Sequence, residues 1–400
     1  MNILIGQSGG PTSVINSSLA GVIAGGQATD GYDKIYGAIG GIAGVLDDEI
    51  IELTDFSEEK LMLLKQTPSS FLGSCRKKLG NDEETYEKIF EIFKKYNIGA
   101  FFYIGGNDSM DTADKLSRYA EKINSDVRIC GVPKTIDNDL AVTDHSPGFG
   151  SAARFVANTA RSLALDTSVY KMKSVIVLEI MGRNAGWLTA AASLGNDNDV
   201  LATDIICLPE RVFDPEKFLE KVAKNADRGI APIIAISEGI KGADGNYLGE
   251  SLSLKEANDG FSHAALGGVG RIVENLISTQ LKIKTRTIEL STLQRCYAQE
   301  ASLQDIEEAF ALGFESVKYA KEGHTGFMPC VKRISDLPYE FEIVPHPVCE
   351  IANVEKIVPD NMITPDGMGI TQDFITYARP LISGQPQRIY ENGILKFIKR

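Results

Sequence analysis

The sequence predicts an α/β protein built from two doubly wound lobes with mainly parallel sheets and a C-terminal extension. Short apolar runs rich in β-branched residues alternate with segments of helical period along most of the 400 residues, which is typical of parallel sheets. About ten alternations are too many for one open sheet of usual width, so we expect two sheets. After about Asp336 the alternation weakens and prolines become frequent, which predicts a mostly extended tail.

The expected elements follow one another along the chain. Strands are expected near residues 2–6, 34–38, 100–104, 127–131, 174–180, 204–208, 232–237 and 285–290, and helices near residues 12–24, 149–165, 214–227 and 268–279. A further helix precedes the strand at 100–104, because its apolar residues recur at helical spacing. These residues are Tyr86, Ile89, Phe90 and Phe93, and we assign them to the core.

Composition and charge limit the function classes. The formal net charge of −13, without a Lys/Arg-rich run, argues against binding to nucleic acid or to an anionic membrane. No stretch approaches the roughly 20 apolar residues needed to span a bilayer, and the first residues predict a strand rather than a signal peptide. The six scattered cysteines predict reduced thiols, and the four histidines lack metal-ligand spacing. We therefore expect a cytoplasmic protein without zinc.

Two glycine turns follow predicted strands and open helices. The first contains Gly9 and Gly10, and the second is Gly105-Gly106-Asn107-Asp108-Ser109. Backbone N–H groups in such turns, together with the helix dipole, favour a bound anion such as phosphate. A purely structural turn is the alternative for the first, and helix capping by Asp108 or Ser109 is the alternative for the second.

The densest polar cluster directly follows the strand that ends at Gly131. It contains Lys134, Thr135, Asp137 and Asp139. Two carboxylates two residues apart provide a candidate general base and a metal-side ligand, while the Lys and the Thr provide a cation and a hydroxyl donor. This combination predicts phosphoryl transfer. An exposed Asx-rich turn is the alternative.

Further polar residues lie at the ends of later strands. The turn from Glu179 to Gly186 contains Arg183, and Ser237-Glu238-Gly239 follows another strand. Arg286 and Arg295 flank a further strand and its exit, and Arg76 lies in FLGSCRKKLG. Arginine suits bidentate contacts to phosphate. Each of these residues taken alone is better explained as a solvated surface cation, but their placement at strand ends favours phosphate binding.

Together these segments resemble the phosphofructokinase family across nearly the whole interval from Gly6 to Arg295. The matching stretches are GQSGGPTSVIN, FLGSCR, IGGNDS, PKTIDND, EIMGR, ISEG and RTIELSTLQR. The resemblance implies two Rossmann-like lobes, with the phosphoryl donor on the first and fructose 6-phosphate on the second. It also implies magnesium and a homo-oligomer, a homodimer or homotetramer, because the family's phosphate-binding arginines can come from a neighbouring subunit.

The resemblance assigns roles to individual residues. Asp137 matches the general base, Thr135 lies near the transferred phosphoryl group, and Asp139 with Asn107 is on the magnesium side. The remaining substrate-binding positions are Gly9, Gly10, Arg76, Met181, Gly182, Arg183, Glu238, Arg286, Thr292 and Arg295. We expect the donor lobe at 1–141, completed by about 296–340, the fructose 6-phosphate lobe at 142–295, and an extension at 341–400.

Two positions bear on the phosphoryl donor. ATP-using bacterial members usually have Gly at the places of Asp108 and Lys134. A carboxylate at 108 would repel the α-phosphate of a nucleotide, and a cation at 134 would stabilise the charge of departing phosphate. Both residues favour pyrophosphate over ATP, and ATP remains the alternative.

Some positions depart from the family pattern. Asn107 replaces an Asp, and Thr292 replaces the usual His or Tyr, so sedoheptulose 7-phosphate is a second candidate substrate. Ser174 replaces an Arg, for which Lys171 or Lys173 offers a substitute cation. A non-catalytic sugar-phosphate-binding homologue is a rival reading. An NAD-dependent oxidoreductase is another, but the first glycine turn lacks the G-x-G-x-x-G spacing.

Overall fold

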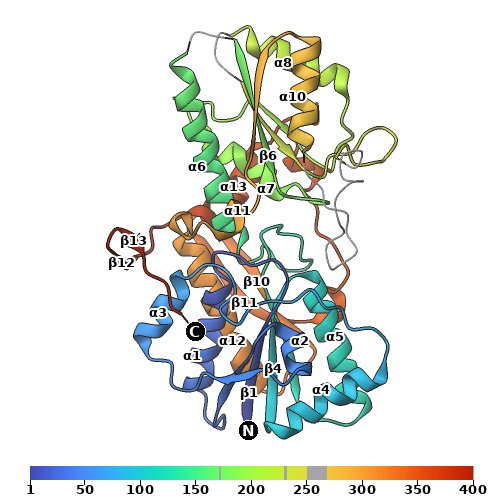
Figure 1. Cartoon of the computed structure of the whole chain (residues 1–400), viewed down its shortest axis with the longest axis vertical. Helices are drawn as coiled ribbons and strands as arrows, with labels where there is room; N and C mark the ends of the chain where they lie inside the picture. The colour runs from blue at the N-terminus through green and yellow to red at the C-terminus, as the bar shows by residue number, and fades with distance from the viewer. Residues whose placement is uncertain (171–172, 229–231, 250–267, 400) are drawn as a thin grey trace. The chain divides into compact units, whose positions relative to one another are not determined.

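The computed structural model describes residues 1–170, 173–228, 232–249 and 268–399 and divides into two compact units (Figure 1). The first unit comprises residues 1–151, 295–355 and 383–400, and the second comprises 152–294 and 356–382. The C-terminal segment set apart in the sequence analysis is thus shared between both units, since its middle part packs in the second.

The sheet of the first unit has seven strands in the order β11-β10-β5-β4-β1-β2-β3 among the described residues. The strands are β1 (Asn2–Gln7), β2 (Ile35–Ala38), β3 (Ile50–Glu52), β4 (Ile98–Gly105), β5 (Arg128–Pro133), β10 (Phe327–Asp336) and β11 (Tyr339–Pro347). The five inner strands pair in parallel, and only the edge strands β3 and β11 are antiparallel to their neighbours. The carboxyl ends of β1, β4 and β5 therefore lie side by side.

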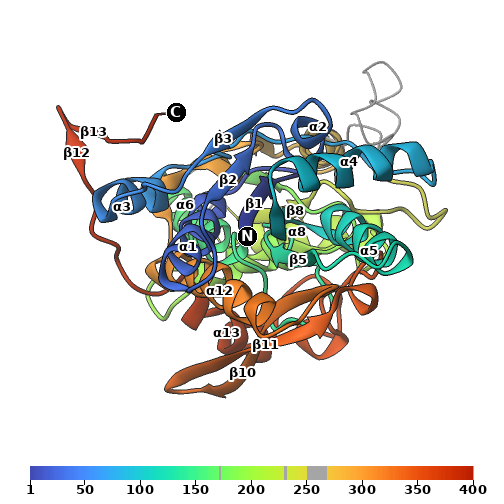
Figure 2. The same cartoon turned by 90° about the horizontal axis from the view of Figure 1, so that it is seen from below.

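Helices cover both faces of this sheet. Helices α1 (Ile15–Ala28) and α12 (Leu303–Lys321) lie side by side on one face, and α4 (Glu83–Lys95) and α5 (Asn107–Lys122) cover the other (Figure 2). The pair α1 and α12 packs closely enough to need glycine. A Cβ on Gly21 would lie 2.1 Å from the carbonyl oxygen of Phe310, so a larger residue would force the helices apart.

Alternate residues of β1 feed the two cores of the first unit. Ile3 and Ile5 pack in the core beneath α1 and α12, whereas Leu4 packs in the core beneath α4 and α5. The apolar face predicted for the helix before β4 is buried in that second core, which confirms it. The remaining elements of this unit are α2 (Gly41–Leu46), α3 (Glu58–Gln66), η2 (Ala298–Glu300), η3 (Val348–Glu350), β12 (Tyr390–Glu391) and β13 (Ile394–Leu395).

The second unit contains a four-stranded parallel sheet in the order β7-β8-β6-β9. Its strands are β6 (Ser174–Ile180), β7 (Ile205–Cys207), β8 (Ile233–Ser237) and β9 (Lys284–Glu289). Helix α6 (Phe149–Ser168) covers one face, and α8 (Pro215–Ala226) and α10 (Val269–Gln280) cover the other (Figure 1). Shorter elements are α7 (Trp187–Ala190), η1 (Ala191–Gly195), η4 (Asp360–Met362), α13 (Gln372–Ala378) and η5 (Pro380–Ile382). The short helix α11 (Leu293–Cys296) contains the residues at which the chain passes from the second unit to the first.

The predicted fold class, with two mainly parallel sheets, is confirmed. The tail is less extended than predicted, because α13 forms a helix whose Phe374 and Ala378 are buried. Over the part of the chain that the structure describes, no helix is long and apolar enough to cross a membrane.

Candidate active site

Three loops leave the neighbouring strands β1, β4 and β5 of the first unit at one edge of the sheet. The loops after β4 and β5 meet directly, since the backbone N–H of Lys134 donates to the carbonyl of Gly105 at 3.0 Å. Gly106 also lies next to the loop after β5, because a Cβ added to it would be 3.5 Å from the carbonyl oxygen of Lys134. The crevice at the carboxyl ends of parallel strands is where open α/β sheets bind ligands.

The first glycine turn is tied to the FLGSCR segment. The N–H of Gly9 donates to the carbonyl of Cys75 at 3.2 Å, and the hydroxyl of Ser74 donates to the carbonyl of Gly9 at 2.7 Å. Gly9 has a φ of 74°, a left-handed conformation that favours glycine. These bonds bring the exposed Arg76, which follows Cys75, to the side of the turn.

Lys134 connects the loop after β5 with the first glycine turn. Its side chain is buried, and Nζ donates to the carbonyl of Gly10 at 2.7 Å. Burial lowers the pKa of Lys134 to about 8, the cations of Arg295 and Arg76 act in the same direction, and Asp137 and Asp139 oppose them. A buried ammonium group therefore stands beside a turn suited to bind anions.

The two carboxylates of this loop are presented from a tight local turn. Asn138 between them is buried and has a φ of 55°, while Asp137 and Asp139 are partly exposed. The N–H of Asp137 donates to Oγ1 of Thr135 at 3.1 Å. Asp137 thus lies at this turn beside Thr135, while Oδ1 of Asp139 is buried.

Asp108 and Asn107 begin helix α5 but do not cap it. The N-cap is Gly106, which has no side-chain hydrogen bond. Oδ1 of Asp108 pairs with Nζ of Lys78 at 2.8 Å, so its carboxylate is turned outward. The amide of Asn107 is engaged by the backbone, accepting from Asn353 N at 2.5 Å and donating to Val354 O at 2.8 Å.

The predicted metal site has fewer candidate ligands, because the amide of Asn107 already bonds to the backbone. No group of three or more His, Cys, Asp or Glu side chains within the described ranges forms a ready metal cage. Magnesium, however, is commonly held by one or two carboxylates plus substrate phosphates and waters. Asp139 is partly exposed and lies close enough to Lys134 for its charge to act on that ammonium group, so it fits this pattern.

Arg295 lies beside the first glycine turn in the first unit. Its Nη1 is 3.0 Å from where a Cβ on Gly10 would be, so glycine at 10 makes room for the guanidinium. Its Nε is buried and has no hydrogen-bond partner among the described residues. A buried, unsatisfied guanidinium N–H is suited to bind an anionic oxygen.

Two turns of the second unit lie side by side at the carboxyl ends of β6 and β8. The N–H of Gly182 donates to Oε1 of Glu238 at 3.4 Å, and a Cβ on Gly239 would be 1.8 Å from the carbonyl oxygen of Arg183. The N–H of Met181 donates to Oε1 of the buried Gln294 at 3.2 Å. Four of the predicted sugar-binding residues are therefore brought together.

Two further predicted residues of this unit, Arg286 and Thr292, are exposed. Arg286 is exposed on β9 opposite Ile176, about four residues along the sheet from the carboxyl end of β6. Thr292 is exposed just before α11. Of the substitute cations, Lys173 pairs with Asp227 at 2.6 Å, and Lys171 lies outside the described residues.

Lys78 and Gln294 contact predicted site residues, although no sequence pattern indicated either of them. Both lie within or beside segments singled out for other residues, Lys78 two positions after Arg76 and Gln294 inside RTIELSTLQR. Nothing local marks Lys78 as the partner of Asp108, because that contact joins two separate loops.

Comparison with known proteins adds independent information. A phosphofructokinase family model matches residues 2–320. The pyrophosphate–fructose 6-phosphate 1-phosphotransferase of Methylococcus capsulatus is 41% identical over 404 residues, which cover 99% of this chain and 95% of that protein. A protein of the same name from Xanthomonas campestris pv. campestris is 41% identical over 403 residues, with 99% and 95% covered. The solved structure of pyrophosphate-dependent phosphofructokinase from Nitrosospira multiformis superposes with a TM-score of 0.90 at 36% identity, covering 100% of this chain and 96% of that one.

Proposed function

The chain belongs to the phosphofructokinase family, and on that premise we propose that it transfers a phosphoryl group from pyrophosphate to the 1-hydroxyl of fructose 6-phosphate. The products are fructose 1,6-bisphosphate and phosphate, in a reversible glycolytic step. The observation that carries this proposal is the meeting of three loops around Lys134, with two glycine turns, two cations and the carboxylate of Asp137 in one unit.

The first unit binds pyrophosphate in this proposal. The turn at Gly9 and Gly10 offers backbone N–H groups, while Lys134 and Arg76 supply positive charge. As the bond to the leaving phosphate breaks, negative charge grows on its oxygens. A preorganised cation such as the buried Lys134 stabilises that charge more than it stabilises the bound substrate, and this difference lowers the barrier.

Asp137 acts as the general base. Its carboxylate accepts the proton of the sugar 1-hydroxyl as that oxygen attacks the phosphoryl group. Thr135, whose Oγ1 accepts the N–H of Asp137, lies at the same turn and is assigned to the transferred phosphoryl group. Positioning and charge stabilisation supply most of the catalysis in such reactions.

A divalent metal is needed by enzymes of this family, and we propose Mg²⁺. Asp139 would hold it together with pyrophosphate oxygens and waters, and the ion would supply neutralisation of the phosphate charge. Asn107 contributes little to this site in our proposal, because both ends of its amide already bond to the backbone of residues 353 and 354.

The turns at Met181 to Arg183 and at Glu238 in the second unit are assigned to the sugar. Arg295 and Arg286 are assigned to its 6-phosphate. Because Arg286 is exposed away from the turns of its own chain, we propose that it serves a neighbouring subunit of a homodimer or homotetramer. We also propose a cytoplasmic location, where these substrates occur and six free thiols stay reduced.

A comparison of pyrophosphate with ATP as the phosphoryl donor tests the proposed function. With purified protein, fructose 6-phosphate and magnesium, we expect fructose 1,6-bisphosphate to form with pyrophosphate and not with ATP at equal concentration. Omission of magnesium, with chelator present, is expected to stop turnover. Turnover with ATP alone would contradict the donor assignment but not the family assignment. No product with either donor would contradict the substrate assignment.

The pKa of Lys134 predicts the alkaline limb of the pH profile. The ammonium form is present below about pH 8 and is lost as pH rises through that value, so kcat/KM for pyrophosphate is expected to fall above about pH 8. Arginine stays charged at all working pH values, so Lys134→Arg should shift this limb upward even if its overall rate is lower. A limb that stays at the same pH in the variant would show that another group controls it.

A further inference from the structure

The loop between β5 and α6 is closed on itself around the proposed base. The N–H of Thr135 donates to the carbonyl of Pro147 at 3.0 Å, and the N–H of Ser146 donates to Oδ1 of Asn138 at 3.0 Å. Asp137 lies between these two tied positions. The place of its carboxylate therefore depends on where the returning half of the loop is held.

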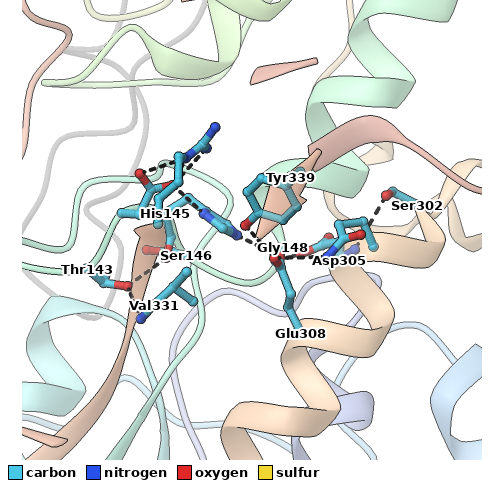
Figure 3. A network of polar contacts seen from close by, with 12 residues as sticks. Thr143, His145, Ser146, Gly148, Ser302, Asp305, Glu308, Val331 and Tyr339 are labelled. Carbon is cyan, nitrogen blue, oxygen red and sulfur yellow. Dashed lines mark hydrogen bonds and ion pairs between the residues drawn. The ribbon is translucent and has the colours of Figure 1, made fainter. Parts of the chain in front are cut away.

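The return segment, residues 145–148, is held by two carboxylates of α12 (Figure 3). Oδ1 of Asp305 accepts from the N–H of Gly148 at 2.9 Å, and Oε2 of Glu308 accepts from Nε2 of His145 at 2.6 Å. Both acids are only 1% exposed. They are three residues apart, so they lie on one face of the helix and accept hydrogen bonds from both ends of the segment.

His145 is a buried cation between two anions. Its Nε2 faces Glu308, and its Nδ1 lies 2.8 Å from Oδ2 of Asp144. Ionised carboxylates only accept hydrogen bonds, so both ring nitrogens must donate and the ring carries a proton on each. Burial alone would lower the pKa of His145, but the charge of Glu308 and the hydrogen bonds to both acids outweigh it and raise that pKa to about 9.

Groups from the sheet complete the cluster. Arg333 on β10 donates from Nη2 to Oδ2 of Asp144 at 2.8 Å, and Tyr339 on β11 donates to Oε1 of Glu308 at 2.6 Å. The same Oε1 accepts from Nε2 of Gln304 at 3.1 Å. In this cluster two carboxylates, those of Asp144 and Glu308, thus pair with two cations, those of His145 and Arg333.

Asp305 holds the other end of the segment through hydrogen bonds alone, without a cation as its partner. It also accepts from the N–H and the hydroxyl of Ser151, in the first turn of α6. It stands in the first turn of α12 as well, where Ser302 is the N-cap. Two helix N-termini therefore stabilise one carboxylate, although burial raises its pKa to about 6.

A buried ion cluster of this kind is costly to desolvate, and apolar residues of similar volume often stabilise a core at least as well. It does impose direction, because each hydrogen bond fixes an angle as well as a distance. We propose that Asp305 and Glu308, acting through Gly148 and His145, are positioning residues that set the place of the Asp137 carboxylate. The inference rests on the proposed function, because it assumes that Asp137 is the base.

The test compares Glu308→Gln with Glu307→Gln. Residue 307 is the adjacent, exposed acid on the same helix, so the control makes the same chemical change outside the cluster. A displacement of about 1 Å can cost on the order of 10²-fold in rate. We expect Glu308→Gln to lower kcat by about 10- to 100-fold and to leave KM for fructose 6-phosphate within about threefold, whereas Glu307→Gln keeps both values.

Backbone amide exchange gives a readout that does not depend on turnover. In Glu308→Gln we expect faster exchange in peptides covering residues 134–148, with no change in peptides of α1. Faster exchange in Glu308→Gln together with an unchanged kcat would show that the contacts from α12 do not position the base, and it would overturn the proposal. Unchanged exchange and unchanged kcat would overturn it as well. Wild-type protein that exchanges slowly but never turns over would refute the proposed function itself, and the positioning role with it.

Milder and combined variants keep the test decisive if Glu308→Gln does not fold. Tyr339→Phe removes only the hydroxyl that bonds Glu308, and we expect a kcat loss of about threefold or more. The double variant His145→Gln, Glu308→Gln should lose no more than the worse single variant, because both changes break the same contact. Full activity of Tyr339→Phe, or losses that multiply in the double variant, would contradict the proposed coupling.

Discussion

Asp137→Asn is expected to lower kcat with pyrophosphate and fructose 6-phosphate by about 10²- to 10⁴-fold. The amide cannot accept the proton of the attacking hydroxyl, yet it keeps the size of the side chain and the N–H bond to Thr135. Because the lost interaction exists only in the transition state, KM for fructose 6-phosphate should stay within about threefold. Steady-state kinetics with both substrates varied measures these effects.

The control for this change is Asp126→Asn. Residue 126 is an exposed acid just before β5, at the opposite end of the strand from Asp137. It should leave kcat unchanged. Turnover of Asp137→Asn within about threefold of the wild-type value would refute the base assignment, and a loss confined to KM would assign Asp137 to binding.

Asp108→Gly is expected to give the second largest effect, a change of donor. Removing the carboxylate relieves its repulsion of a nucleotide α-phosphate and leaves Lys78, which now pairs with Asp108 at 2.8 Å, to meet a phosphate oxygen instead. A like-charge contact costs several kcal/mol, and 1.4 kcal/mol is tenfold in affinity. We expect the ratio of kcat/KM for ATP to that for pyrophosphate to rise by about 10²-fold or more.

Asp108→Asn separates charge from size in this experiment. If repulsion alone excludes ATP, the Asn variant should use ATP nearly as well as the Gly variant. If bulk contributes, only the Gly variant should gain ATP activity. Should neither variant turn over with ATP, Asp108 would not be the residue that selects the donor, and contacts elsewhere in the first unit would have to exclude the nucleotide.

The sequence predicts those parts of the site that depend on local chemistry. Glycine turns after apolar strands and the acids of PKTIDND are signals within a few residues, and the structure places the turns at Gly9 and Gly106 at neighbouring strand ends. The contact of Lys134 with Gly10 joins residues 124 positions apart. Only the parallel order of β1, β4 and β5 brings them together.

Burial of charge was the harder feature to predict. Glu307 and Glu308 are identical neighbours in the sequence, but one is exposed and the other is 1% exposed. A helical-period signal was present, since Asp305, Glu308 and Leu312 fall on one face of α12. Charged residues on such a face are ordinarily assigned to solvent. The partners that keep Glu308 inside come from β11 and from the loop before α6, which no local pattern links.

The order of strands has a consequence for synthesis of the chain. Strand β5 receives its outer neighbour β10 about 190 residues later in the sequence. At translation rates of roughly 5 to 20 residues per second, the nascent chain exposes the unpaired backbone edge of β5 for roughly 10 to 40 s. The loop that carries Asp137 spends a similar but shorter interval without α12, so strands β1 to β5 leave the ribosome before the helix that holds this loop.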